Sequence, residues 1–529
     1  MAPPGYCCEV QREDASVEAP EPRELTHREI LEVLVGLLAA LFTAVISSTI
    51  VSNALPTIIA DLEGSQSQYT WVVTAQLLAM TVSTPIWGKL SDLFSKKLLV
   101  QLSIVTFVVG SILAGLSQDV PQLLAMRVVQ GIGMGGLTAN VQSIIGSIIP
   151  PRQRGRYSGY QGATMAVATV SGPLIGGLIV DTPGLGWRWC FFVCVPLAVV
   201  SLGILHKYLQ VITIRRRVRI DYVGAVLIAI GASLPLLWVS FAGESFDWVS
   251  WQSGAFLGGT ALAVALTILV ELRHEEPLIP LTVVRERTTS LAIVGSVAVG
   301  IAMFGGSVFL SQYFQIAGGH SPTVAGLLNI PLMVGSLLGT VVSGQLISRL
   351  GRWKRFLVIG SCLLLVGLAL LATIDHHTPE WFVLVAMLVM GTGMGMLMQN
   401  YVLAVQNTVD VTQVGAASAT IAFFRSLGGA VGVSALGAIL AAQVSSTVTR
   451  RFVELGIPAD GGGGGSLLDV DSMPASVAAI VREAYGDATG VVFMVAAGIA
   501  VLSVVASLLM REVPLRTTVR KDDLPELPV

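Results

Sequence analysis

Two arginines stand inside long apolar stretches of this sequence. Arg127 lies in LLAMRVVQGIGMGG (123–136), with Gln130 three residues further on, and Arg425 lies in TIAFFRSLGGAVGV (420–433). An arginine within a membrane span costs about 2.5–3.5 kcal/mol and usually faces a cavity or a polar partner. Residues three apart share a helix face, so we expect Arg127 and Gln130 to act together. The alternative for each arginine is a structural role, bonded to carbonyls of a neighbouring helix.

Groups for enzymatic chemistry are nearly absent from these stretches. The 33 acidic residues and six histidines fall in predicted loops, tails or helix ends, and the five cysteines show neither metal-ligand nor disulfide spacing. No G-x-x-x-x-G-K-[ST] motif is present, so ATP is not expected to supply energy. Glu32 and Asp92 remain as candidates for a proton-carrying carboxylate, although neither lies at the centre of a span.

The elements that must position these residues are membrane spans. The chain is 53% hydrophobic and only 12% charged, and its apolar runs reach the ~20 residues that cross a bilayer. We predict an all-α polytopic membrane protein with fourteen spans, at 31–55, 70–88, 98–117, 122–148, 158–180, 188–207, 222–242, 253–271, 289–312, 323–347, 356–374, 381–405, 415–440 and 489–510.

Charge predicts the orientation of these spans. With the N-terminus in the cytoplasm, 25 of the 31 Lys and Arg residues fall on the inner side, four fall outside and two lie within spans. This bias obeys the positive-inside rule and places both termini in the cytoplasm. The long segment 441–488, with GGGGGS at 461–466, is then an outer loop that we expect to be flexible.

An internal repeat divides the spans into two groups. GKLSDLFSKKLLV (88–100), GIGMGG (131–136) and GPLIGG (172–177) have counterparts in the same order at 344–358, 391–396 and 428–433. We therefore predict an N-terminal tail (1–30), a six-helix bundle (31–207), a linker with two inserted helices (208–288), a second six-helix bundle (289–510) and a C-terminal tail (511–529). Parallel repeats of this kind are a transporter architecture.

These motifs resemble the major facilitator superfamily, in its fourteen-span drug:proton antiporter subfamily. GKLSDLFSKK resembles the signature loop of the superfamily, through Gly88, Asp92, Lys96 and Lys97, with Ser95 where the pattern has glycine. The resemblance implies that this loop latches the two halves in one state. It also implies that Arg127 and Gln130, within R-x-x-Q-G-x-G, take part in proton or substrate coupling.

Other motifs extend the resemblance along the chain. GPLIGG matches the antiporter motif at Gly172, Pro173, Gly176 and Gly177, and this motif implies export. ISSTIVSNALPTI (46–58) resembles the motif of the first span at Thr49 and Asn53, with Ser47 at its acidic position. The stretch 399–433 also resembles the subfamily, and the residues that could line a polar cavity there are Gln399, Asn400, Gln406 and Arg425. Hydrogen bonds between helices are the equal alternative for these polar side chains.

The sequence thus predicts a secondary active exporter of drugs or other small amphipathic molecules, driven by proton antiport with alternating access. The alternative within transport is a dedicated exporter of one lipid, siderophore or secondary metabolite; a membrane enzyme or a sensor is a remote one. We expect a monomer in the plasma membrane, with small-molecule cargo, protons and the bilayer as partners. Neither a cofactor nor a metal is expected, and the net charge of −2 gives no reason to expect nucleic acid.

Overall fold

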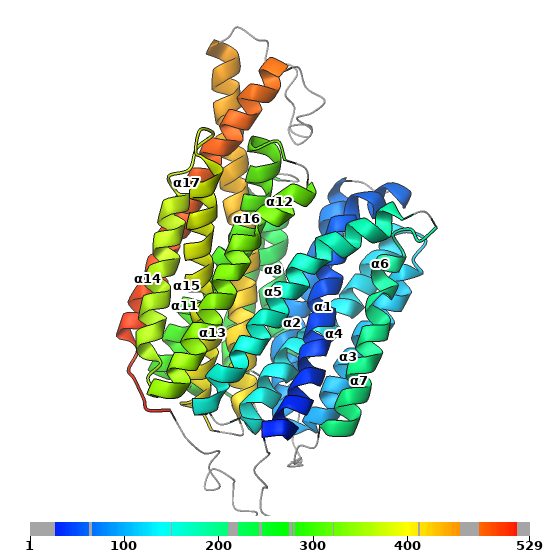
Figure 1. Ribbon diagram of the computed structural model, residues 1–529, viewed down its shortest axis with the longest axis vertical. Coiled ribbons are helices and arrows are strands. Elements are labelled where there is room, and N and C mark those ends of the chain that lie inside the picture. The colour runs from blue at the N-terminus through cyan, green and yellow to red at the C-terminus, as the bar shows by residue number, and fades with distance from the viewer. Residues whose placement is uncertain are drawn as a thin grey trace, which may run out of the picture.

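The computed structural model describes residues 27–62, 66–149, 151–182, 184–209, 221–242, 246–274, 278, 281–320, 322–410, 413–454 and 475–515. This part of the chain is helical, with a single isolated bridge between Ala242 and Phe246 (Figure 1). The tails 1–26 and 516–529, the basic segment 210–220 and the Gly-rich run 461–466 lie outside the described residues.

Long helices run roughly parallel through the whole molecule (Figure 1). Every one of the fourteen predicted spans overlaps a helix or two consecutive helices. In chain order these are α1 (His27–Asp61), α2 (Gln66–Leu93), α3 (Lys96–Gly115), α4 (Val120–Ile148), α5 (Pro151–Asp181), α6 (Trp189–Phe192), α7 (Cys194–Tyr208), α8 (Tyr222–Phe241), α9 (Trp251–Glu271), α10 (Leu281–Arg285), α11 (Arg287–Gln312), the π-helical η1 (Tyr313–Ala317), α12 (Pro322–Leu328), α13 (Ile330–Leu350), α14 (Lys354–Leu371), α15 (Glu380–Gln406), α16 (Val414–Glu454) and α17 (Ala475–Leu509).

Ten helical stretches of the described chain are long and apolar enough to cross a membrane. Helices α2 and α4 are long but fall outside these ten, because Gly, Ser, Thr and Gln interrupt their apolar residues. Both pack against α16 of the other half. Their polar residues therefore face the protein interior, and an average hydropathy does not recognise such helices as spans.

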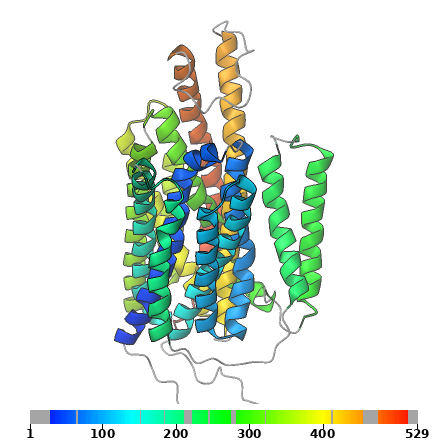
Figure 2. The same cartoon turned by 90° about the vertical axis from the view of Figure 1, so that its right-hand side faces the viewer.

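The same neighbour pattern occurs twice along the chain. Helix α4 packs between α2 and α3, and α1 packs against α5 and α7. In the second half α15 packs between α13 and α14, and α11 packs against α16 and α17. The large hydrophobic cores each lie within α1–α7 or within α10–α17, and a small buried cluster of Trp87, Leu99, Ala139 and Ala419 joins the two halves. The inserted pair α8 and α9 stands beside the main bundle, with α8 on α2 and α16 (Figure 2).

Glycines in α4 and α15 set the close packing within each half. A Cβ on Gly131 or Gly135 would collide with the backbone or side chains of α2, and one on Gly133 would collide with Phe107 of α3. Gly391 and Gly395 have the same relation to α13, and Gly393 to α14. The repeated GIGMGG and GTGMGM motifs thus perform one packing task in the two halves, because small residues let helix backbones approach closely.

The structure corrects the predicted bounds of the outer loop 441–488. Helix α16 continues to Glu454 and α17 already begins at Ala475, so both rise well beyond the other helices (Figures 1 and 2). Buried Leu440, Val444, Val448 and Phe452 recur every four residues along the extension of α16. This spacing keeps one apolar face continuous, so the helix extends past the predicted span boundary at 440.

Candidate functional site

Arg127 is the centre of a buried hydrogen-bond network in the first half. Its side chain is fully buried, its Nε donates to the Val72 carbonyl of α2 at 3.2 Å, and its NH1 donates to Gln130 Oε1 at 2.7 Å. Gln130 Nε2 in turn donates to Ser111 Oγ of α3 at 2.8 Å and to Ser47 Oγ of α1 at 3.2 Å. Side chains on α4 therefore tie four helices together.

This network is neutral apart from the arginine. The position at which the family motif carries an acid is Ser47, and Ser47 accepts a hydrogen bond from Gln130. Among the described residues, no carboxylate bonds to Arg127. Arg127 therefore has both kinds of partner that the sequence suggested. Gln130 shares its helix face, and the guanidinium also donates to a backbone carbonyl of a neighbouring helix.

Asp92 forms the main polar contact between the two halves. Its Oδ1 accepts a hydrogen bond from the Gly415 backbone N–H at 2.9 Å, and its Oδ2 accepts one from the Ala416 N–H at 2.7 Å. These N–H groups belong to the first turn of α16, where a negative charge is favourable. Gly88, one turn earlier on α2, leaves room for Ala419, and Gly415 leaves room for the Asp92 carboxylate. The loop motif thus joins α2 of one half to α16 of the other.

Asp92 and Arg127 lie far apart. Val72 and Asp92 are 20 residues apart on α2, which is about 30 Å along a helix, and Arg127 is bonded at Val72. Asp92 nevertheless lies beside the helix that carries Arg127, because the neighbouring Ser91 Oγ bonds to Ser143 Oγ of α4 at 2.7 Å. Glu32, the other proposed carboxylate, lies on α1 and pairs with Arg28 at 3.1 Å on the surface.

The basic residues of the loop motif contact their own half. Lys97 Nζ donates to the His206 carbonyl near the end of α7 at 2.6 Å, and Lys96 Nζ donates to the Ser143 carbonyl of α4 at 3.4 Å. Ser95, which replaces glycine in the motif, begins α3 by accepting a hydrogen bond from the Leu98 N–H at 3.5 Å. The turn therefore closes without the glycine because serine caps the next helix.

Further contacts between the halves lie at the same end of the bundle. This end, which we call the basic end, carries Arg28, Lys96, Lys207, Arg352 and Arg511 in the loops and helix ends, and the described chain begins and ends there (Figure 1). Gln142 Nε2 donates to Gln399 Oε1 at 3.4 Å, and Arg154 NH1 donates to Gln406 Oε1 at 2.6 Å. Where both partners are described, the hydrogen bonds between α1–α7 and α11–α17 all lie toward this end.

Arg154 was not singled out by the sequence. It is buried, and besides Gln406 it donates to the carbonyls of Ile149 and Gly146 near the end of α4. Its only sequence signal is a place in the basic run RQRGR, which is typical of any inner loop. Gln406 also donates to Ser418 Oγ of α16 at 2.7 Å, so one arginine and one glutamine connect α4, α5, α15 and α16.

The predicted cavity residues have several placements. Gln399 and Gln406 lie at the contact between the halves, whereas Asn400 donates to Ser343 Oγ of α13 at 3.1 Å within the second half. Arg425 is buried and its NH1 donates to the Met398 carbonyl at 3.5 Å. Asn400 and Arg425 therefore have the helix-to-helix hydrogen bonds that were the alternative to lining a cavity.

The antiporter motif packs α5 onto α1. A Cβ on Gly172 would collide with the Thr49 side chain, and one on Gly176 would lie 3.0 Å from the Ile50 carbonyl oxygen. Thr49 donates to backbone carbonyls of its own helix, at 3.0 Å for Ile46. The side chains of Asn53 and Pro173 and the surroundings of Gly177 lie outside the described residues.

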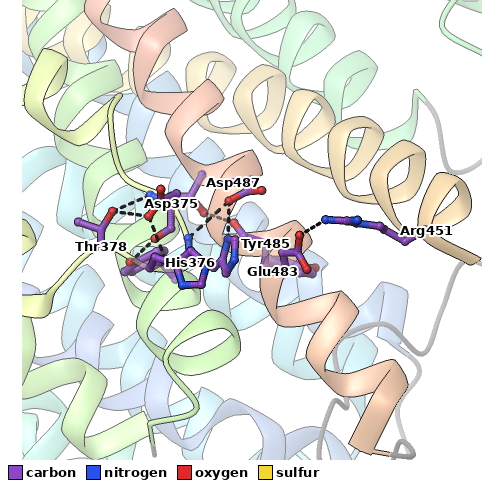
Figure 3. A network of polar contacts seen from close by, with 10 residues as sticks. Asp375, His376, Thr378, Arg451, Glu483, Tyr485 and Asp487 are labelled. Atoms are coloured by element: carbon purple, nitrogen blue, oxygen red, sulfur yellow. Dashed lines mark hydrogen bonds and ion pairs between the residues drawn. The ribbon is translucent and has the colours of Figure 1, made fainter. Parts of the chain in front are cut away.

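A second polar network lies at the opposite end, outside the predicted site (Figure 3). His376 Nδ1 bonds to Asp487 Oδ1 of α17 at 2.9 Å, and Arg451 of α16 bonds to Glu483 of α17. The Thr378 hydroxyl donates to Asp375 and holds the pKa of that carboxyl below its usual value. The network joins the extended parts of α16 and α17 to the α14–α15 connection.

The sequence predicted no metal site, and this network contains the one described group with metal-ligand geometry. Possible ligand atoms of His376, Glu483 and Asp487 lie within 4.8 Å of one another. However, Arg451 pairs with Glu483, and His376 bonds to Asp487, so these groups already have protein partners. Exposed pairs of this kind contribute little stability individually. We interpret the network as a tie between elements.

The fold and the buried polar groups define a membrane transport protein, built from two similar helical halves whose hydrogen bonds to each other lie toward one end. Comparison with known proteins agrees: residues 37–433 match the Major Facilitator Superfamily, and the chain belongs to this family. Its relatives and structural neighbours are transporters, not enzymes.

Two relatives in sequence and one neighbour in fold illustrate these similarities. An uncharacterized MFS-type transporter of Mycobacterium tuberculosis is 33% identical over 483 residues, covering 91% of this chain and 70% of the relative. The multidrug transporter protein MdtP of Bacillus subtilis is 30% identical over 455 residues, covering 86% and 81%. The crystal structure of the human organic anion transporter MFSD10 (TETRAN) is 12% identical and shares the fold, with a TM-score of 0.57 over 89% of this chain and 99% of that one.

Proposed function

We propose that this protein is a secondary active exporter of small molecules, driven by proton antiport. In this proposal it crosses the plasma membrane fourteen times and has both termini in the cytoplasm. The observation that carries the transport function is the similarity to a multidrug transporter over 86% of the chain. The export direction is supported by a similarity to an efflux pump of Dothistroma septosporum, which is 29% identical over 92% of this chain. The GPLIGG packing of α5 on α1 supports it. The overlap of each of the fourteen predicted spans with a helix supports the drug:proton antiporter subfamily.

Alternating access is supported by where the halves touch. Asp92, Gln142 and Arg154 connect the halves toward the basic end, which the charge bias places in the cytoplasm. A transporter with these bonds formed is closed to the cytoplasm. Release of the same bonds would open a path from that side, which an exporter needs in order to load its cargo.

Proton movement can supply the required energy. A charge that falls through 100 mV releases about 2.3 kcal/mol, which sustains roughly a 40-fold gradient of a neutral cargo. The carboxylate that would carry the proton is not identified, because Asp92 is bonded to α16 and Glu32 is paired on the surface. The positively charged centre at Arg127 leads us to propose neutral, anionic or amphipathic cargo in preference to strongly cationic cargo.

Transport by purified protein in proteoliposomes tests this function. With the lumen more acidic than the bath, we expect cargo to accumulate inside as protons leave, and a protonophore to abolish the accumulation. The panel should include uncharged drugs, anionic amphiphiles, lipids and a permanent cation of the ethidium type. Accumulation that survives the protonophore would contradict proton coupling, and accumulation of a single compound would favour the dedicated exporter.

A further inference from the structure

An open pocket lies at the basic end of the second half. Its volume is about 440 Å³, and its walls come from the start of α11, the end of α15 and the segment that follows α17. The lining residues are Glu286, Arg287, Thr288, Asn407, Thr408, Arg511, Val513 and Pro514. None of them belongs to the residues that we connect with transport.

The C-terminal wall of the pocket is firmly attached. The buried Trp353 indole Nε1 donates to the Val513 carbonyl at 2.8 Å, and Asn407 Nδ2 donates to the Pro514 carbonyl at 3.2 Å. Leu515 is buried in the core of the second half. This segment, 511–515, is therefore held in place as a wall, which a specific pocket requires.

The polar groups of the pocket suit a phosphate ester. Within the described part of the chain, the exposed side chains of Arg287 and Arg511 have neither a hydrogen-bond nor an ion-pair partner. Thr288 is only 8% exposed, lines the pocket and forms no side-chain hydrogen bond there. Arg287 and Thr288 begin α11, whose first N–H groups attract an anion. Guanidinium groups bind phosphate oxygens through paired hydrogen bonds.

The charge balance favours a phosphate with a single negative charge. Glu286 lines the pocket beside the two arginines and has no side-chain cap bond to α11. Two guanidinium groups and one carboxylate leave one net positive charge. That charge matches a phosphodiester, whereas the nearby carboxylate would repel a phosphomonoester or free phosphate more strongly.

Apolar side chains continue from the pocket along α17. Leu502, Val505, Leu508 and Leu509 are exposed on the last two turns of that helix, immediately before Arg511. In a membrane this face meets acyl chains, and Arg511 follows at the level where headgroups begin. Basic pockets between spans on the cytoplasmic side bind anionic lipid headgroups in other membrane proteins.

We propose that this pocket binds the phosphodiester headgroup of an anionic phospholipid from the leaflet at the basic end. Arg287 and Arg511 hold the phosphate, the Thr288 hydroxyl donates to it, and an acyl chain lies along the exposed face of α17. The bound lipid would bridge the start of α11 and the end of α17.

The test uses full-length purified protein in detergent. Phosphatidylglycerol is the anionic probe, phosphatidylcholine the neutral one, and glycerol 3-phosphate and inorganic phosphate are the soluble ones. Native mass spectrometry gives the bound lipid, and thermal unfolding gives the shift in Tm on lipid addition. We expect Arg287→Gln/Arg511→Gln to lower phosphatidylglycerol binding by at least about tenfold and to remove its Tm shift.

The matched control is Arg349→Gln/Arg352→Gln. It removes two exposed arginines from the same end of the bundle that do not line the pocket, and it should keep both effects. Arg511→Gln alone, in an exposed segment, serves if the double variant does not fold. Unchanged binding in the pocket variants, or an equal loss in the control, would overturn the proposal. Competition by glycerol 3-phosphate or phosphate at equal concentration would show a soluble-anion site and would overturn the lipid assignment.

Discussion

At the scale of single residues, the notable feature is a buried cation that has no acidic partner among the described residues. Arg127 is bonded to one carbonyl and one amide, and through Gln130 to two serines on other helices. A charge in this setting is tolerated in the protein interior only because its N–H groups find acceptors. Any acid that approached it, from the cargo or from a moving helix, would gain a strong partner. The network can therefore respond to charge.

We predict that Arg127→Ala abolishes export and leaves membrane insertion intact. The change removes the charge and leaves Gln130 Oε1 and the Val72 carbonyl without their donor. The measurement is the initial rate of cargo accumulation in proteoliposomes, which should fall by at least about tenfold, or about 1.4 kcal/mol. Arg188→Ala is the control, because the ion pair of Arg188 with Asp61, at 3.5 Å, is exposed. Full transport by Arg127→Ala would remove the coupling role.

At the scale of helices, the sequence predicted more of the fold than of its contacts. All fourteen predicted segments are helical, because long apolar runs between charged loops specify spans directly. The bond between Asp92 and α16 depends on residues more than 300 positions apart, and no local pattern contains that distance. Arg154 was missed for the same reason. The extension of α16 could have been predicted from its four-residue apolar spacing.

The contact between α2 and α16 gives the prediction at this scale. Asp92→Asn should open the basic end, because hydrogen bonds to a charged acceptor contribute about 1.5–3 kcal/mol and an amide can accept at only one of its two positions. Spin labels at Leu98 and Arg349, one on each half, should report longer distances by pulsed electron resonance. Transport should change because the balance between the two states shifts.

Asp119→Asn is a matched control for this change. Asp119 begins α4 by accepting a hydrogen bond from the Gln122 N–H at 2.7 Å, within one half and at the opposite end. The Asp119→Asn substitution removes the same charge from the same kind of helix start, and Asp119 has its contact within one half. If both variants give the same distance distribution as the unmodified protein, Asp92 does not hold the halves together.

At the scale of the whole molecule, the two halves repeat each other and touch asymmetrically. Helix α2 packs on α16 and α13 packs on α5, which are equivalent pairs if the halves are superposed by their neighbour patterns. The polar contacts, however, gather toward the basic end. A pair of similar bodies whose polar contacts gather at one end can exchange them for contacts at the other end by a small rotation.

A reversible cross-link between the halves tests this movement. In a protein without its five native cysteines, Gln142→Cys/Gln399→Cys places one thiol on α4 and the other on α15, where the native side chains meet at 3.4 Å. Bridging them with a short bis-methanethiosulfonate reagent should stop export, and a reductant should restore it. Ser103→Cys/Asn140→Cys, whose native atoms lie 3.1 Å apart within one half, should export normally when bridged. Because the two bridges differ mainly in whether they span the halves, unimpaired export with α4 and α15 bridged would mean that this contact stays closed throughout transport.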